Sequence, residues 1–185
     1  AKHLKPYGWD YIVVDFCWYY PQSQADLKVS PPWQKIKADG SMDPKLTMDR
    51  YGRLMPVVKK FPSAASGMGF KKLGDYIHSL GLKFGIHIMR GIPREAVNNK
   101  MPIFGAKGID ASMIANRQDT CTWLNHMYGI NMEKPGAQKY LNSLFALYSS
   151  WGVDFVKVDD ITRPYHQKEI EGYQKAIQHS GRKMV

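Results

Sequence analysis

The chain has 185 residues, 44% of them hydrophobic and 12% aromatic, which is enough for one domain with a packed core. Its formal net charge of +10 would suit an anionic partner, but Lys and Arg are scattered along the chain and accompany no nucleic-acid-binding motif. No apolar run approaches the roughly 20 residues that cross a bilayer. We therefore expect neither a nucleic-acid partner nor a membrane partner.

The two ends of the sequence and its cysteines set further bounds. The chain opens on a charged stub, 1–5, unlike a signal peptide, and stops at 183–185 as a further strand begins, so we expect a fragment of a longer protein. Cys17 and Cys121 are too few for a disulfide framework, and their spacing matches no metal site. They leave the redox compartment open.

One phrase recurs in chain order: a glycine, two residues, an aromatic or apolar residue and then, in most copies, a β-branched run. It starts at Gly8, Gly81 and Gly152, and again at Gly181 near the end of the chain. Each glycine stands where a helix should end in the left-handed conformation that glycine adopts cheaply. The phrase predicts three strands and the beginning of a fourth.

The segments between these strands have helical periodicity. Apolar residues recur at helical spacing over 70–80, and residues 137–151 have a broad apolar face. Strands and helices therefore alternate, and the strands look buried on both faces, which is typical of a parallel α/β sheet. A (β/α)8 TIM barrel and an open doubly wound sheet both fit this order.

The connections differ greatly in length. The strand-to-helix connections 19–66 and 90–136 are long, whereas each helix-to-strand turn takes two or three residues. Most irregular sequence thus lies at the carboxyl ends of the strands, where both folds build their sites. Because Pro, Trp and Tyr punctuate the long connections, we expect them to be ordered walls of a site. No dinucleotide fingerprint or phosphate loop follows a strand, so no cofactor is expected.

The predicted strands end in polar residues: Asp15, His87, Lys157 and Asp159. Alternation places Lys157 and Asp159 on one face of their strand. Burying both charges would cost on the order of several kcal/mol of desolvation each, and a role in chemistry is one reason to tolerate that. Structural alternatives remain for each residue: a turn cap for Asp15, a core histidine for His87, an ion pair for Lys157 with Asp159. Asp160 is expected to support the turn.

The aromatic residues and carboxylates together favour glycoside chemistry. Trp18, Trp33 and Trp123 are candidates for a sugar-stacking wall, with ordinary core packing as the alternative. The sequence has no metal-ligand cluster and no Ser/His pair, so no metal is expected. Glycosidases need two carboxyl groups beside the scissile bond, and the chain offers only one convincing member.

Four segments taken in order resemble glycoside hydrolase family 27, the α-galactosidase or melibiase family, which includes α-N-acetylgalactosaminidases. These segments are 8–18, 61–62, 75–87 and 151–159. The resemblance implies a (β/α)8 barrel followed by a β-sandwich. Residues 1–185 would form a single partial catalytic barrel domain covering about strands two to five. The first strand, the later strands and the sandwich would lie outside the chain.

The resemblance also implies roles for the residues at the strand ends. Asp159 takes the place of the nucleophile, and Lys157 takes that of the lysine that donates hydrogen bonds to sugar hydroxyls. Asp15 takes the place of an aspartate that holds hydroxyls of the ring. His87 stands where a site tyrosine is common. Two further residues fall in the same substrate-binding block, Phe16 and Trp18.

Three departures from the family pattern bear on function. Phe16 replaces a second aspartate, which removes a polar contact to the sugar, and Ile161 replaces a cysteine of the disulfide near the site. The family's general acid/base follows a later strand, beyond this chain, so the chain by itself is expected to be inactive. Secretion or a periplasmic location is common in the family.

The function implied is that of a retaining hydrolase whose partner is a carbohydrate substrate. It would cleave terminal α-linked galactose-type residues from oligo- or polysaccharides. The alternatives are an α-N-acetylgalactosaminidase, a β-L-arabinopyranosidase, or a barrel that binds carbohydrate without catalysis.

Overall fold

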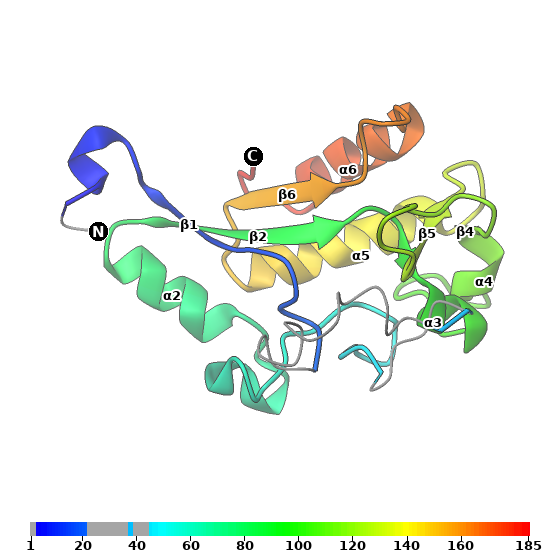
Figure 1. Cartoon of the computed structure of the whole chain (residues 1–185), viewed down its shortest axis with the longest axis horizontal. Helices are drawn as coiled ribbons and strands as arrows, with labels where there is room; N and C mark the ends of the chain where they lie inside the picture. Colours follow the sequence, from blue (N-terminus) through cyan, green and yellow to red (C-terminus); the bar gives the residue numbers. More distant parts are fainter. Residues whose placement is uncertain (1–2, 22–36, 39–44) are drawn as a thin grey trace.

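The computed structural model describes residues 3–21, 37–38 and 45–185, and its centre is a three-stranded parallel sheet (Figure 1). The strands are β1 (Tyr11–Val14), β2 (Lys83–Met89) and β6 (Phe155–Asp159), in the order β1-β2-β6. Val14 pairs with Ile86, and His87 pairs with Lys157. The three predicted strands are therefore confirmed as parallel neighbours.

Helices connect these strands as the periodicity predicts. They are α2 (Lys71–Ser79), α5 (Ala137–Ser150) and α6 (Gln167–His179), preceded by the short 3-10 helices η1 (Lys5–Tyr7) and η3 (Pro62–Gly67). The glycines that follow α2, α5 and α6 all have the left-handed conformation, with φ of 68° at Gly81, 77° at Gly152 and 69° at Gly181. The recurring glycine therefore marks the turn from helix to strand.

The long connection after β2 is ordered and contains a second sheet that the sequence did not predict. Its strands are antiparallel: β3 (Ile92–Pro93), β5 (Met127–Ile130) and β4 (Ala115–Asn116), in the order β3-β5-β4. The short helices α3 (Arg94–Asn98) and α4 (Ala111–Ile114) accompany it. Figure 1 shows this unit beyond the carboxyl end of β2. Such short strands lack a periodic signal of their own.

The core lies between one face of the parallel sheet and the helices. Phe84, Ile86 and Ile88 of β2 are buried, and Val14, Val156 and Val158 pack against the same cluster. Edge-to-face ring contacts join Trp18, Phe70 and Trp151 under the sheet. Such contacts between large rings contribute much of the apolar burial in a core.

The expectation that the strands are buried on both faces is wrong for two of the three. β2 is buried along nearly its whole length, but every residue of β6 and all of β1 are half-buried or exposed. Strand order contributes to this difference, because only β2 has a named strand on each side, whereas the residues of β1 and β6 lack such a neighbour on one side.

The last residues begin a further ladder beside β6, as the sequence predicts. The Val185 N–H donates to the Asp154 carbonyl at 2.9 Å, and the Val156 N–H donates to the Val185 carbonyl at 2.9 Å. Among the described residues, no helix combines the length and apolar character needed to cross a membrane.

Candidate active site

The open face of the parallel sheet gathers the polar residues predicted at the strand ends. Because His87 and Lys157 pair in register, their side chains lie on the same face, together with Asp159 two residues further along β6. His87 Nε2 lies 3.2 Å from Asp159 Oδ2. Asp15, just after β1, places Oδ1 3.9 Å from Lys157 Nζ. All four residues therefore meet at the carboxyl ends of the strands.

The cost expected for burying Lys157 and Asp159 does not arise in this structure. The Lys157 side chain is 51% exposed and the Asp159 side chain is 36% exposed. Both side chains keep contact with water because the sheet face above them is uncovered among the described residues. The ion pair that Lys157 makes is with Asp15 rather than with Asp159. A ligand could reach all three side chains from the open side.

The carboxylate of Asp159 is held at both oxygens. Oδ1 accepts the backbone N–H of Asp160 at 2.8 Å, and Oδ2 faces the His87 ring. Burial alone would raise the pKa of Asp159. The hydrogen bonds from His87 and Asp160, with the positive charge of Lys157, outweigh burial and hold that pKa below its ordinary value. Asp159 is therefore ionised at neutral pH and fixed in direction.

His87 is a buried residue that contacts two other residues of the site, Asp159 and Phe16. It is 1% exposed, and its Nδ1 has no hydrogen-bond partner among the described residues. The Phe16 ring meets the His87 ring edge to face at 5.7 Å and lies 5.4 Å from the Tyr20 ring. Phe16 thus gives an apolar wall beside His87. Asp15 takes part in the local turn as well, because its Oδ1 accepts the Phe16 N–H at 2.9 Å.

The tryptophans divide between core and surface. The expectation that Trp18 contributes to a sugar-stacking wall is wrong in this structure, because its ring is 1% exposed and its Nε1 donates to the His87 carbonyl at 2.7 Å. Trp18 instead ties the first connection to β2. Trp33 lies outside the described residues. Trp123 is exposed, so its stacking role stays a prediction.

A set of charged residues that no sequence motif reveals lies beside the turn after β6. Arg90 follows β2 and is 3% exposed, and its guanidinium donates to Asp119, Asp160 and Glu169. Burial raises the pKa of Glu169 to about 7, although the charge of Arg90 opposes that rise. Asp160 supports the turn, as expected. Asp119 and Glu169 lie in distant segments and have no local motif that would reveal them.

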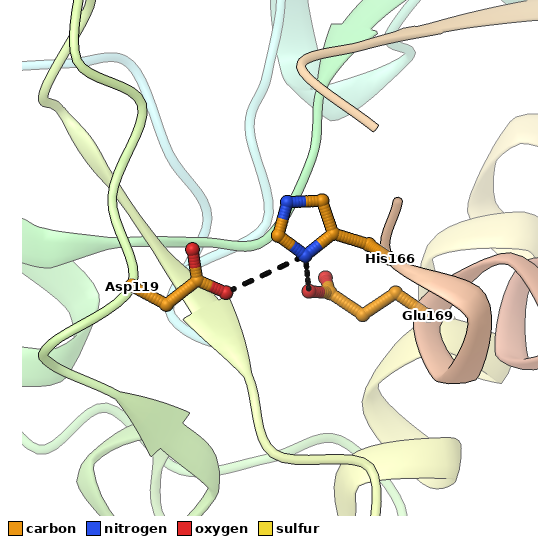
Figure 2. Close-up of side chains that lie close together, drawn as sticks. All are labelled: Asp119, His166 and Glu169. Carbon is orange, nitrogen blue, oxygen red and sulfur yellow. Dashed lines mark ion pairs between the residues drawn. The ribbon is translucent and has the colours of Figure 1, made fainter. Parts of the chain in front are cut away.

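Asp119, His166 and Glu169 have the arrangement of a possible metal site (Figure 2). His166 Nδ1 lies 3.7 Å from Asp119 Oδ2 and 4.0 Å from Glu169 Oε1. Those two oxygens, however, both accept from Arg90 Nη1, at 2.9 and 2.8 Å. The guanidinium therefore already supplies the cation between the carboxylates, and a second cation there would be repelled by it.

Both cysteines are free. Burial raises the pKa of the Cys17 and Cys121 thiols to about 11 each, so both are protonated and unreactive at neutral pH.

Solved structures and curated sequences resemble the chain over nearly its full length. A proposed α-N-acetylgalactosaminidase of Bacillus halodurans is 52% identical with a TM-score of 0.84, covering 99% of this chain and 41% of that one. A family 27 β-L-arabinopyranosidase of Geobacillus stearothermophilus is 49% identical with a TM-score of 0.88, covering 100% of this chain and 41% of that one. α-Galactosidase 3 of Hypocrea jecorina is 26% identical over 180 residues, 89% of this chain and 27% of that protein. No family model matches the chain.

The relatives that match the chain carry the names of glycosidases, so the class of protein that they indicate is a glycosidase-like enzyme family. Within that class, the similarity over nearly the whole chain supports a segment of glycoside hydrolase family 27, in agreement with the resemblance seen in the sequence. It spans 41% of the two solved structures and 27% of the curated relative.

Proposed function

We propose that the protein containing this chain is a retaining glycoside hydrolase that removes terminal galactose-type residues from oligo- or polysaccharides, with Asp159 as nucleophile. The observation that supports this best is the state of the Asp159 carboxylate. It lies at the carboxyl end of β6, is partly open to water, and has each oxygen held by a hydrogen bond. A nucleophilic carboxylate must be ionised, accessible and fixed, and Asp159 meets these three requirements.

The reaction would proceed by two displacements. Asp159 attacks the anomeric carbon, so a glycosyl ester forms while the glycosidic C–O bond breaks and a general acid protonates the leaving oxygen. The same acid, now a base, takes a proton from water, which attacks the anomeric carbon and releases Asp159. Retaining pairs of carboxyl groups lie about 5 Å apart. The partner carboxyl group would come from a strand outside residues 1–185.

Lys157 and Asp15 would hold the sugar ring. Their side chains are exposed, lie 3.9 Å apart and flank the open face beside Asp159. The ammonium can donate to two ring hydroxyls and the carboxylate can accept from one, a combination suited to neighbouring hydroxyls of a pyranose. His87 would orient Asp159 rather than bind the sugar, since the residue is buried and its Nε2 lies 3.2 Å from Asp159 Oδ2.

The three parallel strands and the ladder begun by Val185 would form about strands two to five of a (β/α)8 barrel. The support for this is the order β1-β2-β6, the short turns at the amino ends of the strands and the match to 41% of the solved relatives. The first strand, the later strands and a β-sandwich would belong to the rest of the protein.

A β-L-arabinopyranoside is the second candidate glycone, because of Phe16. The ring of Phe16 lies against His87, and by the sequence resemblance Phe16 takes the place of an aspartate that contacts the sugar. A pentopyranose lacks the hydroxymethyl group of galactose and so needs fewer hydrogen-bond partners in the wall of the site. The Geobacillus relative is named as a β-L-arabinopyranosidase. Hydrolysis of a panel of nitrophenyl glycosides of α-galactose, α-N-acetylgalactosamine and β-L-arabinopyranose would rank the three glycones.

Asp159→Asn in the full-length protein should lower kcat at least about 1,000-fold, because the amide cannot form the glycosyl ester. Hydrolysis of the best nitrophenyl glycoside checks this. Asp10→Asn is the matched control, since Asp10 is also a partly exposed carboxylate, but it is paired with Lys83 at the opposite end of the sheet. A 2-fluoro glycoside should label the peptide containing Asp159. Turnover like that of the wild type in Asp159→Asn would refute the assignment, and sugar binding without turnover by the wild type would indicate a non-catalytic barrel.

A further inference from the structure

Arg90 uses every N–H group of its guanidinium in a hydrogen bond. Nε donates to the Asp160 carbonyl at 2.7 Å, Nη1 donates to Asp119 at 2.9 Å and to Glu169 at 2.8 Å, and Nη2 donates to Asp119 at 2.9 Å and to Asp160 at 3.1 Å. A guanidinium has five N–H groups, so each has an acceptor. The backbone N–H of Arg90 also donates to the Asp159 carbonyl at 3.1 Å.

These contacts hold the residue that follows the proposed nucleophile. Asp160 has the left-handed conformation, with φ of 59°, which costs free energy for a residue with a side chain. Arg90 donates hydrogen bonds to both the backbone carbonyl and the side-chain carboxylate of Asp160, and so restrains this residue at two points. The N–H of Asp160 is the group that donates to Asp159 Oδ1. The path from Arg90 to the Asp159 carboxylate therefore contains a single intervening residue.

Stability is a weak explanation for this arrangement. The Arg90 side chain is 2% exposed, and removing a guanidinium and its carboxylate partners from water costs much of what their attraction returns. A rigid fork is the side chain best able to fix several oxygens in direction, which a lysine cannot do.

We propose that Arg90 is a positioning residue: held by Asp119 and Glu169, it fixes the left-handed turn at Asp160 and so aims the carboxylate of Asp159 at the sugar. The proposal rests on the proposed role of Asp159 as nucleophile. It assigns to Asp119, on the connection between β4 and β5, and to Glu169, on α6, the task of holding the arginine fork in place.

Arg90→Lys in the full-length protein keeps the charge but loses the fork. We expect kcat to fall about 100-fold, the cost of a displacement of about 1 Å at the reacting group, while KM changes little. Loss of the Asp160 N–H from Asp159 Oδ1 removes a hydrogen bond that favours the ionised form, so the acidic limb of kcat/KM should move to higher pH. Asp119→Asn, which removes one charge without a change of size, should shift both quantities in the same direction by less.

The matched control is Arg182→Lys. Arg182 holds the other end of β6 in a similar way, donating to Asp154 at 2.6 Å and to the Val153 carbonyl at 2.9 Å, far from the strand end that bears Asp159. It should lower the melting temperature and leave the acidic limb in place. The rate constant for labelling by a 2-fluoro glycoside is taken from the time course of the protein that becomes labelled, so unfolded protein does not affect it. A lower rate constant then reports misplacement of Asp159, and a smaller labelled fraction reports loss of folded protein.

The outcomes are distinct. If Arg90→Lys and Asp119→Asn both label at the wild-type rate with an unmoved acidic limb, while Asp159→Asn is inactive, the positioning role is overturned and the proposed function stands. If Asp159→Asn is active, the proposed function is overturned instead.

Discussion

Lys157 and Asp15 are the two charged residues of the site whose side chains stay largely in contact with water. The Lys157 ammonium is 3.9 Å from Asp15 and half exposed, so the ion pair adds little to stability. A half-exposed lysine adjacent to the proposed nucleophile is a good candidate for binding substrate. Asp159, by contrast, is held by neighbours on two sides, as a group that must not move would be.

Lys157→Met should therefore weaken the enzyme without weakening the fold. Losing a charged hydrogen bond to the sugar, worth roughly 1.5–3 kcal/mol, should lower kcat/KM about 10- to 100-fold, with no change in melting temperature. Lys83→Met is a close control, since both lysines are 51% exposed and paired with an aspartate, but Lys83 lies at the amino end of β2. Equal kinetic losses in the two variants would argue against a substrate contact by Lys157.

Helix α2 shows how an element is fixed by close approach rather than by propensity. Gly74 lies in its interior, where glycine costs a helix about 1 kcal/mol relative to alanine. A Cβ at Gly74 would come within 2.3 Å of the Trp151 carbonyl, which is backbone and cannot swing away. Glycine at position 74 thus lowers the helix propensity of α2, but it lets the helix lie against the end of α5 and the ring of Phe84.

Gly74→Ala should lower the free energy of unfolding by about 1–3 kcal/mol, the usual cost of overpacking, even though alanine favours the helix. Gly172→Ala in α6 is the matched comparison. Its Cβ would meet the ends of the Met132 and Leu141 side chains rather than backbone, and the Met132 end, which is the nearer, is flexible. Chemical denaturation of both variants checks this, and a Gly74→Ala protein as stable as the wild type would show that α2 can shift.

At the scale of the whole molecule, His126 joins the two long connections. It is fully buried, its Nε2 lies 3.2 Å from the Tyr19 hydroxyl and its Nδ1 lies 3.1 Å from the Tyr20 hydroxyl. Burial, with the positive charge of Arg94, lowers the pKa of His126 to about 3. The folded protein therefore holds this ring neutral while the unfolded chain protonates it below about pH 6.5.

The sign of the resulting pH dependence follows by linkage. Between about pH 3 and 6.5 the unfolded chain binds a proton on His126 and the folded chain does not. Acid therefore favours unfolding, by at most about 1.4 kcal/mol per pH unit. His126→Gln should be less stable than the wild type at pH 7, and the difference should narrow as the pH falls toward 4. Urea denaturation at a series of pH values measures it. His179→Gln, on the exposed side of α6, should keep the wild-type slope, and equal slopes in all three proteins would contradict the prediction.

Much of the fold was predictable from local pattern. Helical spacing over 70–80 and 137–151 located α2 and α5 to within a residue or two, and glycines in the left-handed conformation marked where strands begin. Alternation along β6 placed Lys157 and Asp159 on one face, next to His87. These features depend on neighbours in the chain, so a sequence can express them.

Contacts between distant segments had to come from the tertiary structure. The partners of Arg90 are 29, 70 and 79 residues away, at Asp119, Asp160 and Glu169, and no motif links them. The tertiary structure also placed Trp18 in the core and left Lys157 in water, because burial depends on which elements lie opposite. Local pattern was enough to show which residues stand at the strand ends. Only packing across the whole chain decided which of them are held, and by what.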